Sequence, residues 1–190
     1  MVRESYLYLK DEKVKKIQYN DSYAHLIKKF PSANSNMDSY IINNALNDKA
    51  EGKAVTFLFV NENEDLLYGY YSRFATSINY SDDESGEFCG ISAVEIKCFA
   101  INESYSGKLC EVISSGRELN YSDRLFMEVL MDIKYLADNY MGIEAIVLRS
   151  TERAYNFYTR NEFEPLWGTL DLPYDEFAKD CIKMYLPIAK

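Results

Sequence analysis

The sequence predicts a mixed α/β domain, and two stretches carry that prediction. Lys53 to Val60 (KAVTFLFV) is rich in β-branched and aromatic residues, and Leu66 to Ile78 follows it after a polar turn, which predicts an antiparallel pair of strands. From Ser122 onward, apolar residues recur at helical spacing, which predicts a long amphipathic helix. Because no repeat or linker divides residues 1–190, we expect one domain with a central mixed sheet flanked by helices.

Two helices are expected before this pair of strands. Asp21 to Phe30 predicts a short helix that ends at Pro31, because proline cannot continue it. Asn36 or Asp38 is then a suitable N-terminal cap for a second helix that runs to about Lys49.

The later segments alternate between strand and helix. In chain order they are a strand at 92–101, a segment of uncertain structure at 102–121, the long helix, a strand at 145–148, a helix at 152–160 capped by Thr151, and strands at 163–169 and 181–187. The strand at 145–148 (AIVL) is too short and apolar to lie at an edge, so it is expected inside the sheet.

Composition narrows the classes of function. With 47% hydrophobic residues the chain is expected to fold, and its net charge of −9 argues against nucleic acid as a partner. A basic edge near the N-terminus is interpreted as a solvated face. Its members are Lys13, Lys15, Lys16, Lys28 and Lys29.

Metal sites and several common catalytic motifs are not expected. The four cysteines never form CxxC, and the single histidine, His25, is interpreted as an exposed bystander, so no zinc site is predicted. The sequence contains no Walker loop, no GxG dinucleotide fingerprint and no GxSxG. It also shows no signal peptide and no apolar run long enough to span a bilayer, so we expect a cytoplasmic protein without a membrane partner.

The order of motifs in the second half resembles the GNAT family of acetyl-CoA-dependent N-acetyltransferases. The matching stretches are VEIKCFAINESYSGK from Val94, the helix 123–139, IEAIVLRS, and AYNFYTRNEF from Ala154. Phe30 to Ala50 and Leu66 to Tyr71 also resemble the toxin-like branch of that family. The resemblance implies a GNAT-like acyl-CoA N-acyltransferase fold, acetyl-CoA as co-substrate without a metal, and a primary amine on a small molecule, protein or peptide as acceptor.

The resemblance also assigns roles to individual residues. Tyr158 matches the general acid that protonates the departing thiolate, and Phe157 is expected to anchor the same helix in the core. Glu95 is the best candidate for a base, with a solvated polar face as the alternative interpretation. The residues expected to bind the coenzyme are Phe99, Ala100, Ile101, Gly107, Lys108, Arg124 and Asn156.

The sequence departs from the family at two loops. Gly107 and Lys108 begin the glycine-rich coenzyme loop, but no second glycine of that motif follows and LCEVISSGRELNYS is inserted. Asp123 in the first turn of the following helix repels a diphosphate, although Lys108 and Arg124 supply compensating charge. Glu162 stands where the family has glycine, which predicts a differently built turn.

Three functions follow from this pattern. The first is an acetyltransferase that moves acetyl from acetyl-CoA to an amine by direct transfer. The second is a catalytically impaired GNAT-fold binding module. The third is a toxin-like enzyme acting on aminoacyl-tRNA. The sequence leaves open the acceptor, a protein antitoxin as partner, and the oligomeric state, a homodimer included.

Overall fold

The computed structural model describes residues 6–10, 12–81 and 87–188. The chain divides into two compact units, which we call unit 1 (Met1–Arg73 with Cys98–Asp132) and unit 2 (Phe74–Lys97 with Ile133–Lys190). Two strands and one helix, β4, β5 and α4, run through both. Residues 82–86 of the acidic loop that links β4 to β5 lie outside the described residues.

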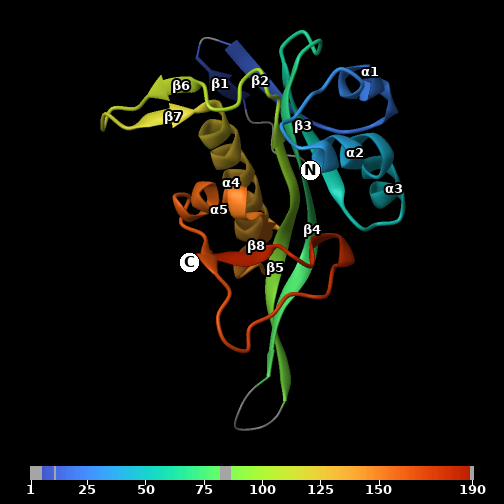
Figure 1. Ribbon diagram of the computed structural model, residues 1–190, viewed down its shortest axis with the longest axis vertical. Coiled ribbons are helices and arrows are strands. Elements are labelled where there is room, and N and C mark those ends of the chain that lie inside the picture. The colour runs from blue at the N-terminus through green and yellow to red at the C-terminus, as the bar shows by residue number, and fades with distance from the viewer. Residues whose placement is uncertain (1–5, 11, 82–86, 189–190) are drawn as a thin grey trace. The chain divides into compact units, whose positions relative to one another are not determined.

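Among the described residues, eight strands are hydrogen-bonded in the order β1-β2-β3-β4-β5-β8-β10-β9 (Figure 1). They are β1 (Tyr6–Leu9), β2 (Glu12–Gln18), β3 (Val55–Asn61), β4 (Leu67–Ser81), β5 (Phe88–Ile101), β8 (Ala145–Ser150), β9 (Glu164–Pro165) and β10 (Ile182–Pro187). β5 and β8 are parallel, whereas β1 to β4 are successively antiparallel, as are β8, β10 and β9. The expected mixed sheet is therefore confirmed.

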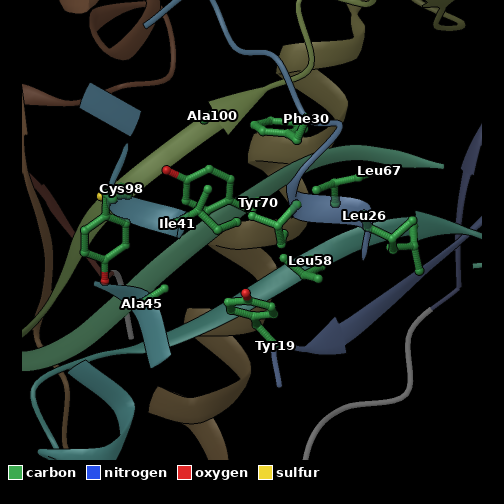
Figure 2. Packing of buried hydrophobic residues seen from close by; sticks show 13 residues of the cluster. Tyr19, Leu26, Phe30, Ile41, Ala45, Leu58, Leu67, Tyr70, Cys98 and Ala100 are labelled. Carbon is green, nitrogen blue, oxygen red and sulfur yellow. The ribbon is translucent and has the colours of Figure 1, made fainter. Parts of the chain in front are cut away.

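In unit 1 both faces of the sheet are covered by helices. One face packs against η1 (Asp21–Tyr23), α1 (Ala24–Ile27), α2 (Ser35–Asn43) and α3 (Ala45–Ala50) (Figures 1 and 2). Leu58 and Val60 of β3 point into this cluster, while Phe59, between them, stacks on Tyr71 of β4 with ring centroids 5.6 Å apart. Successive side chains of a strand alternate between faces, so β3 reads as a continuous apolar run because both of its faces are covered.

The helix α4 (Tyr121–Asn139) covers the second face within unit 1. The ring of Phe126 lies 5.0 Å from that of Phe99 of β5, and Tyr71 donates a hydrogen bond of 2.6 Å to Asp132. Asp132 also pairs with Lys16 of β2 and Arg73 of β4, so a buried group of charges joins the helix to two strands.

In unit 2 the strand β8 lies between β5 and β10, as its apolar sequence predicts. Its parallel register with β5 runs from Ala93↔Ala145 to Ile96↔Leu148. Ala93 and Ala145 belong to a buried cluster with Leu172 from the segment between β9 and β10. The helix α5 (Glu152–Thr159) follows β8, and η2 (Glu176–Ala178) precedes β10.

Two parts of the fold differ from the sequence-based expectation. The lysine-rich N-terminal segment forms β1 and β2, which the sequence analysis did not predict, because Val14 is fully buried while Lys13 and Lys15 pair with Glu62 and Glu64 at the surface. The segment 102–121, left without an assignment, begins with a turn and then forms the hairpin of β6 (Leu109–Val112) and β7 (Glu118–Asn120).

Several helix and strand boundaries also differ. Asn34, rather than Asn36 or Asp38, caps α2 by accepting from the backbone N–H of Asn36, and the expected helix is divided into α2 and α3 at Asn44. The side chain of Thr151 makes no capping hydrogen bond at α5. The strand expected at 163–169 is reduced to the two residues of β9.

Within the described part of the chain, no helix is long and apolar enough to cross a membrane. The same residues contain no group of three or more His, Cys, Asp and Glu side chains arranged to hold a metal ion.

Candidate active site

The end of α5 places Tyr158 through a Schellman motif. The N–H of Phe163 donates to the carbonyl of Tyr158 at 3.1 Å, and the N–H of Glu162 donates to that of Thr159 at 3.0 Å. These two bonds define the motif, and the apolar contact that usually accompanies it is present, since the rings of Tyr158 and Phe163 lie 6.1 Å apart. The motif therefore fixes the tyrosine ring at the point where the chain leaves the helix.

Glu162 occupies the position of the motif that favours glycine. Its φ of 70° is left-handed, so the turn keeps the glycine-type backbone. The prediction of a differently built turn is thus wrong, because hydrogen bonds and the packing of Phe163 hold a glutamate in a conformation that its Cβ disfavours.

Glu162→Gly is expected to raise the free energy of unfolding by about 0.5–1 kcal/mol, because glycine adopts this backbone without steric cost. Urea denaturation measures the change. The matched control is Arg153→Gly, at an exposed site inside α5, which should lower stability by about 1 kcal/mol. Equal losses in both variants would contradict the strain at Glu162.

The aromatic pair of α5 lies the other way round from the expectation. Tyr158 is buried, with 9% of its surface exposed, whereas Phe157 is only half-buried and carries the guanidinium of Arg160 5.0 Å from its ring centroid. Phe157 is therefore not the core anchor. Asn156, a predicted coenzyme ligand, is exposed on the same helix.

Glu95 lies in unit 2 with a partner that the sequence analysis missed. Its Oε1 accepts from Nε of Arg149 at 2.9 Å, and Arg149 also donates to the carbonyl of Pro173 at 2.6 Å. Oε2 of Glu95 is buried and has no hydrogen-bond partner among the described residues. Burial raises the pKa of Glu95, and the nearby Arg149 opposes that rise. The sequence offered no direct signal for this pair, since it depends on the register in which Glu95 pairs with Val147, two residues before Arg149.

The predicted thioester residues Phe99, Ala100 and Ile101 form the end of β5. The register with β8 stops at Ile96, and β5 continues to Ile101. On the β4 side this extension is fixed, because Asn102 N–H donates to the carbonyl of Tyr68 at 2.8 Å and its side chain donates to that of Leu67. An extended segment of this kind presents backbone groups of the type that pair with amides.

The remaining predicted ligands lie at the start of α4, beside the β6–β7 hairpin (Figure 1). Gly107 has a left-handed φ of 69°, and the carbonyl of Lys108 accepts from the N–H of Tyr121, the first residue of α4. Arg124 pairs through Nε with Glu111 of β6 at 2.6 Å. Unit 1 thus brings Lys108 and Arg124 to one end of α4, but engages Arg124 with a carboxylate of its own.

Unit 1 also contains a pocket of about 250 Å³. His25 and Lys29 of the α1 region, Asp65 before β4, and Asn102 contribute its polar lining, and leucines and Phe30 contribute the rest. His25 is exposed, as the sequence predicts.

These residues fit acetyl-CoA in part. The end of β5 suits the amide-bearing pantetheine arm, and the phenol of Tyr158 belongs to a class of group that can serve as an acid. The start of α4 does not fit a diphosphate in the family's manner, because Asp123 there is buried, with 4% of its surface exposed.

No protein-family model and no curated protein matches the chain. Solved structures do match. A bacterial toxin aligns with a TM-score of 0.68 and 15% identity over 93% of this chain and 91% of the toxin. AtaT complexed with acetyl-methionyl-tRNAfMet aligns with a TM-score of 0.67 and 14% identity, over 92% of this chain and 94% of AtaT.

A third structure, AtaTR bound with acetyl-CoA, aligns with a TM-score of 0.66 and 15% identity over 93% of this chain and 94% of that one. At such low identity the likeness concerns the fold. The chain therefore has the fold of these toxins, which is the GNAT-like mixed α/β fold that its motifs predict.

Proposed function

We propose that the protein is an N-acetyltransferase that moves the acetyl group of acetyl-CoA to a primary amine by direct transfer. The observation that supports the proposal is the Schellman motif, which fixes the ring of Tyr158, the residue to which the resemblance assigns the general acid, at the end of α5. The fold is shared with AtaTR, which was solved with acetyl-CoA bound.

Different residues of the chain have different roles in the proposed reaction. Backbone groups of Phe99 to Ile101 hold the pantetheine arm and polarise the thioester carbonyl; one such donor at a developing oxyanion is worth about 3 kcal/mol. Acetyl-CoA supplies the activated acetyl group. In unit 2, the resemblance assigns to Tyr158 the transfer of its hydroxyl proton to the leaving sulfur. Glu95, whose Oε2 has no hydrogen-bond partner among the described residues, accepts the proton of the attacking amine. The resemblance also assigns Gly107, Lys108, Arg124 and Asn156 to the rest of the coenzyme, but the start of α4 does not fit its diphosphate, because Arg124 is paired with Glu111 and Asp123 is buried there.

Calorimetry of the full chain with acetyl-CoA tests the proposal first. A saturable heat at micromolar concentrations, together with acetyl transfer to a panel of amines, is the expected result. A chain that binds acetyl-CoA but acetylates none of them would instead be the GNAT-fold binding module. Absence of any binding would contradict the proposal.

Glu95 as base predicts a specific pH profile. Because the base must be ionised and burial raises the pKa of Glu95, kcat/KM should rise with pH through a transition above the usual carboxylate range. Glu95→Gln should abolish this limb and lower the rate about 10²-fold or more. The control is Glu152→Gln, at an exposed site on α5. A profile that is identical in Glu95→Gln would leave the base assignment without support.

Aminoacyl-tRNA is the second candidate acceptor, and it is favoured by the fold shared with AtaT, solved with acetyl-methionyl-tRNAfMet. In this chain the basic edge is mostly paired, since Lys13, Lys15 and Lys16 contact carboxylates. Lys28 and Lys29 are exposed, and Lys29 lines the pocket of unit 1. These two exposed lysines weaken the expectation, drawn from the net charge, that nucleic acid is not a partner, because a short basic segment suffices to contact a few phosphates.

A gel shift of charged tRNA at two salt concentrations tests this acceptor. Binding that weakens with salt and is reduced in Lys28→Glu and Lys29→Glu supports tRNA, because phosphate contacts release counterions. The control is Lys134→Glu on α4. Equal loss in the control would indicate a general charge effect, and acetyl transfer to small amines only would reject tRNA.

A further inference from the structure

Most backbone donors of the segment that follows β5 are already engaged within the protein. Coenzyme diphosphates at helix N-termini are held by backbone N–H groups of the preceding loop and of the first turn. Here the N–H groups of Tyr105, Ser106 and Lys108 donate to the carbonyls of Asn102, Glu103 and Tyr105 at 2.9, 3.2 and 3.2 Å. The N–H of Ser104 donates to the side chain of Asn102 at 3.0 Å. Because each donor carries one proton, these groups are not available to a phosphate without breaking the turn.

Aromatic packing holds this turn in place. The ring of Tyr105 lies 4.9 Å from that of Tyr68 and 5.0 Å from that of Tyr121. The hydroxyl of Tyr68 in turn donates to Glu12 of β2. The turn is therefore fixed to β4 and to the start of α4 in a conformation that satisfies its own N–H groups.

The two N–H groups at the junction of β7 and α4 are engaged in the same way. A side-chain oxygen of Asp123 accepts from the N–H of Asn120 at 2.9 Å, and the carbonyl of Lys108 accepts from the N–H of Tyr121 at 3.1 Å. β7 ends at Asn120 and α4 begins at Tyr121, so no loop intervenes that could wrap around an anion. The buried carboxylate of Asp123 stands where a helix would otherwise favour a phosphate.

The charges around this end of α4 are balanced rather than positive. Arg124 is paired with Glu111, and the ammonium of Lys10 lies 5.7 Å from the ring centroid of Tyr121. Burial, and to a smaller extent the carboxylate of Glu12, raise the pKa of Tyr105. The exposed Lys108 adds one cation. Water and salt screen the attraction between this cation and an anion.

We propose that this site takes its acyl donor through the pantetheine arm alone and leaves the nucleotide diphosphate without a protein cradle. The inference rests on the proposed acetyl transfer and names its donor class: acetyl thioesters of pantetheine, with or without the nucleotide. Asp123 and the self-satisfied turn 102–108 are the determinants, because they occupy the donors and place a negative charge where the diphosphate would bind.

Calorimetry on the full chain compares three probes: acetyl-CoA, S-acetyl-pantetheine, and ADP phosphorylated on its ribose as in the coenzyme. We expect Kd values for the two thioesters to agree within about threefold, a difference below 1 kcal/mol. We also expect no heat from the nucleotide, and little change of either Kd between low and high salt. Acetyl-CoA binding more than about 30-fold tighter than S-acetyl-pantetheine, or displacement by the nucleotide, would overturn the inference.

The pattern of results separates this inference from the proposed function. Tight binding of acetyl-CoA alone overturns the inference and supports the acetyltransferase. Binding of neither thioester overturns both.

A variant that removes the charge of Asp123 provides a second test of the inference. Asp123→Asn keeps a side-chain oxygen for the N–H of Asn120, so the helix start is preserved while the charge is removed. It should tighten acetyl-CoA about three- to tenfold and leave S-acetyl-pantetheine unchanged. The matched control is Asp138→Asn at the exposed far end of α4, with thermal melting to verify folding of both variants. Unchanged acetyl-CoA affinity in Asp123→Asn would overturn the role of Asp123.

Discussion

Tyr158→Phe is expected to lower kcat about 10²-fold or more while leaving KM for acetyl-CoA nearly unchanged, because it removes only the proton that the leaving sulfur receives. The ring itself stays. Its edge-on contacts with Phe157 and Phe163, with centroids 5.2 and 6.1 Å away, need no hydroxyl, and neither does the Schellman motif. Initial-rate kinetics with an identified amine acceptor measure the effect.

The same helix supplies a matched control for this variant. Tyr155 is half-buried on α5, three residues before Tyr158, and Tyr155→Phe should retain full activity. Thermal melting of both variants should show little change in Tm. A Tyr158→Phe enzyme with an unaltered kcat would show that another group, or water, protonates the sulfur, and Tyr158 would then be only the C-terminal anchor of α5.

Lys16→Met should lower the free energy of unfolding by about 3 kcal/mol, the low end of the range for breaking a buried ion pair. The side chain of Lys16 is 1% exposed, and its ammonium contacts Asp132 and lies 3.8 Å from Glu128. Methionine leaves Glu128 without this cation. Asp132 keeps the hydroxyl of Tyr71 and the guanidinium of Arg73, which limits the loss.

Urea denaturation measures this loss against a control on the same strand. Lys13 pairs with Glu62 at 3.4 Å, with side chains 29% and 62% exposed, so Lys13→Met should cost no more than about 0.5 kcal/mol. Adding Glu128→Gln to Lys16→Met should recover part of the stability if charge is the cause. Equal effects of Lys13→Met and Lys16→Met would refute a buried ion network that joins α4 to β2.

The sequence predicted the elements whose local pattern is unambiguous. β3, β4, β5, α4, β8 and α5 were expected close to where they lie, because apolar runs and helical spacing reflect burial directly. β2 was missed because EKVKKIQ carries lysines on both faces. Lys16 is buried by its carboxylate partners on α4, more than 100 residues away, and no local pattern reports that pairing.

The candidate site divides in the same way. The motif AYNFYTRNEF pointed to Tyr158 through the family resemblance alone. The Schellman motif that follows the tyrosine was not expected, because Glu162 stands where its sequence signature has glycine. Which aromatic is buried was decided by packing, and it is Tyr158 rather than Phe157, the expected core anchor. The pairing of Arg149 with Glu95 depends on the register between β5 and β8, which cannot be read from the sequence.

The sequence by itself determined the α/β class, the succession of β3, β4, β5, α4, β8 and α5, and the loss of the glycine-rich loop, since residue type and spacing show each of these directly. Only the tertiary structure decided what replaces that loop. The N–H groups of residues 102–106 and 108, and those of Asn120 and Tyr121, donate to carbonyls and to the side chains of Asn102 and Asp123, so the protein itself supplies the partners of these donors.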